Sequence, residues 1–72
     1  MKVKVFGRLT EICGSSLVEI DTVESVELVK EMMENKFPVL KQQNYIVAID
    51  KVIARSSNVV KPDSEIAFMP PY

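Results

Sequence analysis

The segment DTVESVELVKEMMENKFP, residues 21–38, decides the fold, because it carries helical periodicity and the segments around it alternate like strands. Val26, Val29 and Met33 fall at positions i, i+3 and i+7, which is the spacing of the apolar side of an amphipathic helix. The opposite side carries the charged residues Glu27, Lys30, Glu31 and Glu34. The pattern predicts one helix with a single apolar side.

Both ends of this helix are marked by residue type. Asp21-Thr22 offers an N-cap, so we expect the helix to begin directly after it. Pro38 cannot continue a helix and biases the residue before it towards extended geometry. The helix should therefore end near Asn35 or Lys36.

The segments around the helix alternate between polar and apolar residues, as strands with one buried face do. In the first of these, residues 2–9, Val3 and Val5 share one face. Further strands are predicted around residues 18–20, 45–49, 51–55 and 65–69, with a turn-like segment at 11–16 and a tight turn at Asp50-Lys51. One apolar helix side needs an apolar sheet face to cover it, so we expect an α+β domain spanning residues 1–72, with one main helix on a mixed sheet of four to five strands.

Composition excludes several classes of function. The 72 residues carry a net charge of −1, so a basic face for nucleic acid is not expected. No apolar run reaches the roughly 18–20 residues of a membrane span, and the N-terminal sequence does not resemble a signal peptide. With Cys13 as the lone cysteine, the expected location is the cytoplasm.

The chain also lacks the residues that most small enzymes and metal proteins use. It contains no histidine and one cysteine, so zinc clusters and Ser-His or Cys-His pairs cannot be assembled. No other acid–base or nucleophile constellation is evident. We therefore expect a protein that is not an enzyme by itself and that binds neither a metal nor a cofactor.

Three large apolar residues interrupt the polar phase of three strands. Phe6 lies in the phase of the lysines of the first strand, and Met69 lies in the phase of Glu65. Ile53 lies between two basic residues, whereas Val52 takes the phase expected to face the helix. If these strands are neighbours, Phe6, Ile53 and Met69 form an exposed apolar patch of the kind that marks a partner site. The alternative is that twists or bulges return them to the core. The basic residues that could surround such a patch and attract an acidic partner are Arg8, Lys51, Arg55 and Lys61.

The end of the chain carries a more specific signal. The string KPDSEIAFMPP, residues 61–71, together with FGRLTE at residues 6–11, resembles the MoaD branch of the ubiquitin-like MoaD/ThiS sulfur carriers. The resemblance covers essentially the whole chain and implies a β-grasp fold. It also implies the function of the small subunit of molybdopterin synthase, in molybdenum cofactor biosynthesis.

In that family the C-terminal carboxylate is adenylated by an E1-like enzyme that uses ATP, and it then becomes a thiocarboxylate that donates sulfur. The implied partners are this enzyme and the large catalytic subunit, in a heterotetramer. Pro70-Pro71 would act as a stiff spacer. The expected partner-binding residues are Phe6, Ile53, Phe68, Met69, Pro70, Pro71 and Tyr72.

One departure from the family is plain, since the sequence ends at Tyr72 without the terminal Gly-Gly of the carriers. Either the natural chain continues to Gly-Gly, or the domain is a non-carrier, ubiquitin-like interaction module that ends at Tyr72. A carrier for another sulfur pathway, such as that of thiamin, is a further alternative.

Overall fold

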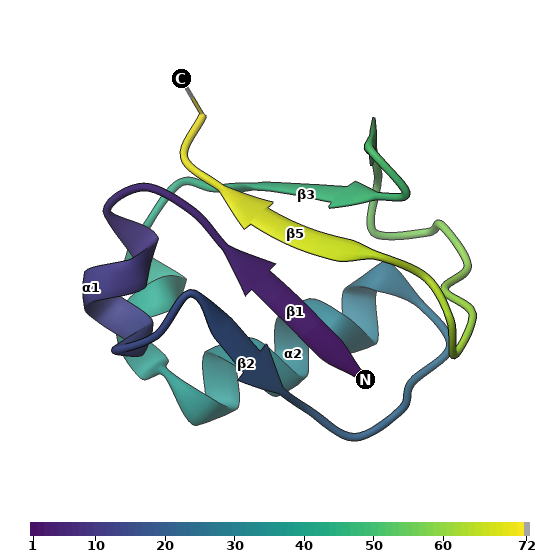
Figure 1. Cartoon of the computed structure of the whole chain (residues 1–72), viewed down its shortest axis with the longest axis horizontal. Helices are drawn as coiled ribbons and strands as arrows, with labels where there is room; N and C mark the ends of the chain where they lie inside the picture. The colour runs from purple at the N-terminus through teal and green to yellow at the C-terminus, as the bar shows by residue number, and fades with distance from the viewer. Residues whose placement is uncertain (72) are drawn as a thin grey trace.

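The computed structural model describes residues 1–71, and among them five strands form one mixed sheet in the order β2-β1-β5-β3-β4. The elements, in chain order, are β1 (Lys2–Val5), α1 (Leu9–Cys13), β2 (Leu17–Glu19), α2 (Val26–Lys36), the 3₁₀ turn η1 (Pro38–Gln42), β3 (Ile46–Ile49), β4 (Val52–Ile53) and β5 (Ile66–Met69). The first and last strands are parallel neighbours at the centre, and α2 lies behind the sheet (Figure 1). This topology is the expected β-grasp fold.

The core lies between α2 and the sheet, where sequence periodicity places it. Val26, Val29 and Met33 of α2 are completely buried. Across from them, Val3 of β1 and Phe68 of β5 are equally buried. The helix ends at Lys36, as predicted from Pro38.

Two predicted boundaries are wrong. The first strand ends at Val5 rather than Leu9, and residues 9–13, which include the first half of the predicted turn, form the short helix α1. Leu9 is completely buried, which holds this helix against the core, and Gly14 ends it with φ +71°. Helix α2 begins at Val26, with Ser25 rather than Asp21-Thr22 as its N-cap.

Val52 is also placed differently from its prediction. It was expected to face the helix, but it is 68% exposed. Strand β4 has only two residues and lies at the edge of the sheet, where it pairs with β3 alone among the described strands. Side chains of so short an edge strand have neighbours on one side only, so alternation does not bury them.

Candidate functional site

A row of four paired residues crosses the sheet on the face away from α2. Lys4 of β1 is opposite Ala67 of β5, and Ala67 is opposite Ala48 of β3. Ala48 is in turn opposite Ile53 of β4. The two central positions carry methyl groups, so the face is low in the middle of the row.

Larger apolar side chains surround this low centre and make a hollow of about 430 Å³. Phe6 stands beyond the end of β1, Met69 at the end of β5 and Ile53 on the edge strand. Phe6 is 46% and Ile53 70% exposed, whereas Met69 is half-buried. The predicted apolar patch therefore exists. We call these three residues, with Ala48 and Ala67, the apolar hollow.

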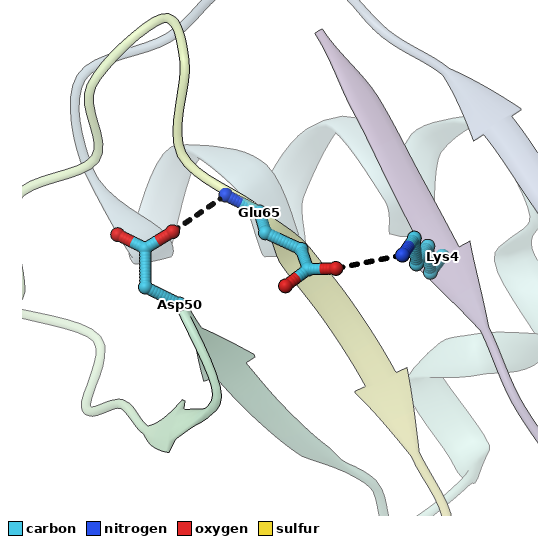
Figure 2. A network of polar contacts seen from close by, with 3 residues as sticks. All are labelled: Lys4, Asp50 and Glu65. Atoms are coloured by element: carbon cyan, nitrogen blue, oxygen red, sulfur yellow. Dashed lines mark hydrogen bonds and ion pairs between the residues drawn. The ribbon is translucent and has the colours of Figure 1, made fainter.

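Charged side chains line one side of the apolar hollow. Lys4 Nζ lies 2.6 Å from Glu65 Oε1, and Figure 2 shows this pair beside Asp50. Asp50 Oδ1 accepts a hydrogen bond of 2.9 Å from the backbone N–H of Glu65 (Figure 2). The hydrogen bond from Lys4, and then its charge, lower the pKa of Glu65. Lys51 is the third charged residue that lines the hollow, after Lys4 and Glu65.

The other predicted partner-binding residues are placed as follows. Phe68 is completely buried beneath the sheet, so the prediction that its side chain meets a partner is wrong. Alternation along β5 explains this, because Phe68 points to the opposite face from Ala67 and Met69. Pro70 and Pro71 are half-buried, and the chain runs away from the sheet after β5 (Figure 1). Tyr72 lies outside the described residues.

The prediction that basic residues surround the apolar patch is only partly confirmed. Of Arg8, Lys51, Arg55 and Lys61, only Lys51 lines the hollow. Lys4 and the two alanines of the floor were not predicted. The sequence does place Ala67 on the same face of its strand as Met69. It does not show that Ala67 lies beside Lys4 and Ala48, because those neighbours are determined by the order of the strands in the sheet.

Two kinds of reactive group can be assessed directly in the described residues, metal-binding clusters and the cysteine thiol. Residues 1–71 contain no group of three His, Cys, Asp or Glu side chains that could hold a metal ion. Cys13 is buried, and burial raises the pKa of its thiol, which keeps it protonated and unreactive. Over the same part of the chain, no helix is long and apolar enough to cross a bilayer.

Comparison with known proteins agrees with this architecture. The sequence model of the ThiS family matches residues 3–72. No curated protein sequence matches the chain significantly.

Among solved structures, a protein designated provisionally as molybdopterin converting factor subunit 1, from Pyrococcus furiosus, is 19% identical with a TM-score of 0.90, over 99% of this chain and 95% of that one. SAMP1 from Haloferax volcanii is 20% identical with a TM-score of 0.84, over 99% and 93% of the two chains. At these identities the likeness shows a shared fold.

Proposed function

Because the chain belongs to the ThiS family of ubiquitin-like sulfur carriers, we propose that it is the small, sulfur-carrying subunit of a cytoplasmic molybdopterin synthase. Its C-terminal carboxylate would be adenylated with ATP by an E1-like partner, with release of pyrophosphate. A sulfur nucleophile would then displace AMP and leave a thiocarboxylate. The thiocarboxylate would enter the active site of the large catalytic subunit and donate its sulfur there to a pterin precursor. The two kinds of subunit would form a heterotetramer, with two small subunits at the ends of a dimer.

The observation that carries this proposal is the apolar hollow beside the point where the chain leaves the sheet. Met69 lines the hollow, and Pro70 follows it directly. A partner that fills the hollow would therefore lie next to the departing chain. Small floor residues between large walls suit one bulky apolar side chain of that partner, which is how interface hot spots are commonly built.

The polar rim supports a partner of particular charge. Lys4 is already neutralised by Glu65, so Lys51 is the cation at the hollow whose charge is less fully compensated. A carboxylate beside the partner's apolar anchor would complement it. Such a rim charge acts mainly on association rate.

Adjacent exposed residues of β4 provide a matched test. Ile53 lines the hollow and Val52 does not, yet they are 70% and 68% exposed. We expect Ile53→Lys to weaken binding of the large molybdopterin synthase subunit from the same genome at least about tenfold, which is roughly 1.4 kcal/mol. Val52→Lys should leave the affinity within about twofold, or roughly 0.4 kcal/mol. Titration calorimetry measures both, and equal losses would contradict the assignment of the hollow.

The carrier chemistry has a separate test. Intact mass spectrometry of the natural protein should show a chain that ends in Gly-Gly, with a fraction in which sulfur replaces one terminal oxygen. A natural chain that ends at Tyr72 would instead support the non-carrier interaction module.

A second sulfur pathway is the main competing function, because the matching family is ThiS and a similar fold occurs in SAMP1, whose full name is small archaeal modifier protein 1. Affinity capture followed by identification of the acceptor separates the possibilities. Capture of the large molybdopterin synthase subunit favours the proposed role. Capture of a thiamin-pathway enzyme, or isopeptide-linked products, would favour the alternatives.

A further inference from the structure

The backbone at Gly7 touches the first residue beyond the last strand. A Cβ atom built on Gly7 would lie 2.6 Å from Cγ and 3.2 Å from Cδ of Pro70. These distances are shorter than van der Waals contact, so the proline ring occupies the space that a side chain at position 7 would need. Gly7 also has φ +59°, a conformation in which glycine is favoured.

The turn that contains Gly7 is held from both sides. Before it, the N–H of Phe6 donates to the carbonyl of Phe68 at 3.0 Å, which extends the β1–β5 pairing. After it, the N–H and the hydroxyl of Thr10 donate to the carbonyl of Gly7 at 3.1 and 2.8 Å. The turn is therefore fixed to the sheet, whereas Pro70 lies one residue beyond the end of β5.

We propose that Gly7 is a positioning residue whose bare α-carbon seats the Pro70 ring and so sets the direction in which the chain leaves the sheet. Proline fixes φ near −65°, so one contact on its ring also orients the peptide that follows. The inference rests on the proposed function, in which this departing segment is presented to a partner. Phe6 precedes Gly7 and Met69 precedes Pro70, and both line the apolar hollow. The contact between Gly7 and Pro70 therefore fixes the direction of the departing chain relative to the surface on which a partner would dock.

The contact between Gly7 and Pro70 predicts the effect of adding a methyl group at position 7. The turn is anchored by hydrogen bonds, and the terminal segment is the freer of the two partners. Gly7→Ala should therefore displace Pro70 and redirect the exit, while the sheet stays intact.

Gly14 supplies a matched control. It has φ +71°, close to that of Gly7, but no heavy atom lies within 4 Å of an added Cβ. Gly14→Ala therefore carries the same kind of backbone strain without a contact to Pro70. We expect both variants to lower the melting temperature, with the larger loss in Gly7→Ala, which must also relieve the contact with Pro70.

Nuclear magnetic resonance of the chain alone tests the proposal. In the wild type, the Hα protons of Gly7 should show nuclear Overhauser contacts to the ring of Pro70. In Gly7→Ala, shift changes at Met69 and in the Pro70 and Pro71 rings should be several-fold larger than in Gly14→Ala. Pro70→Ala removes Cγ and Cδ, so adding Gly7→Ala to it should produce no further change at Met69.

Three results would overturn the proposal. The first is the absence of nuclear Overhauser contacts between Gly7 and Pro70 in the wild type. The second is an equal chemical-shift change at Met69 in the Gly7→Ala and Gly14→Ala variants. The third is a further shift change at Met69 when Gly7→Ala is added to Pro70→Ala. These measurements need no partner or sulfur chemistry, so their failure leaves the carrier role untouched. Failure to find a thiocarboxylate would likewise leave them standing.

Discussion

The ring of Tyr45 stacks on the ring of Phe68, with centroids 4.8 Å apart and planes inclined by 17°. Tyr45 directly precedes β3, and its hydroxyl donates a hydrogen bond to Glu34 of α2. Burial, and then this hydrogen bond, raise the pKa of Tyr45 above its usual value. One side chain thus connects the helix to the strand from which the terminal segment departs.

Two substitutions separate the ring of Tyr45 from its hydroxyl. Tyr45→Phe keeps the stack and should cost about 1 kcal/mol of unfolding free energy through the lost hydrogen bond. Tyr45→Ala also removes the packing against Phe68 and should cost about 3 kcal/mol. Urea denaturation measures both. Equal costs would mean that the hydrogen bond, rather than the stack, stabilises this end of the molecule.

The ion pair between Lys4 and Glu65 predicts a pH effect. The pKa of Glu65 is lower in the folded protein than in the unfolded chain, where it is about 4.3. The ion pair therefore stabilises the fold above the unfolded pKa, and this stabilisation is lost as the pH falls through the folded pKa of Glu65. Both side chains are exposed, so the effect on stability should be small and should fade with salt.

Lys4→Met should raise the pKa of Glu65 towards its usual range, measured by carboxyl ¹³C titration at low salt. Lys2→Met is the control, because Lys2 lies on the same strand but is not paired with Glu65. If both variants shift the pKa of Glu65 equally, the cause is net charge and not the 2.6 Å contact.

The start of α2 provides a further prediction, because the sequence suggested the wrong cap. The hydroxyl of Ser25 accepts a hydrogen bond of 3.2 Å from the N–H of Leu28. Ser25→Ala should therefore cost about 1 kcal/mol, and Thr22→Ala should stay within about 0.5 kcal/mol of the wild type. Thermal or chemical denaturation checks this. A larger loss in Thr22→Ala would restore the cap predicted from sequence.

The physical reason for this shifted start lies far away in the chain. The first two N–H groups of the helix, those of Val26 and Glu27, donate to the carbonyls of Asn58 and Ser56, both at 3.0 Å. A loop some thirty residues later thus completes the first turn. Local sequence cannot contain that information.

The same distinction explains which other features were predictable. Val3 and Met33 belong to segments in which apolar residues recur at a regular spacing, and such a spacing indicates which face of a strand or helix is buried. Helix α1 has five residues, too few to show a helical period. The side of the sheet on which Val52 lies, and the contact of Gly7 with Pro70, depend on strand order and tertiary packing. The exposed phase of Phe6 and Ile53 was visible in the sequence, whereas the hollow between them was not.

The turn between β3 and β4 carries the last prediction. Asp50 and Lys51 have φ of 50° and 70°, both in the left-handed region that disfavours side chains. Ile49 is directly opposite Val52, so the two residues form the whole connection, and hairpin turns of this kind favour glycine at the second position. Lys51→Gly should therefore raise the unfolding free energy by about 1 kcal/mol.

Lys51→Ala is its matched control, because alanine removes the charge but keeps the Cβ atom that causes the strain. Only Lys51→Gly should gain stability in urea denaturation, while both variants should slow association with an acidic partner to the same extent. A gain shared by both variants would assign the effect to the charge of Lys51 beside Lys4 and the apolar hollow, and not to the turn. A gain in neither would mean that the left-handed turn costs lysine no measurable free energy, because alanine and glycine would then be equivalent at a position with φ of 70°.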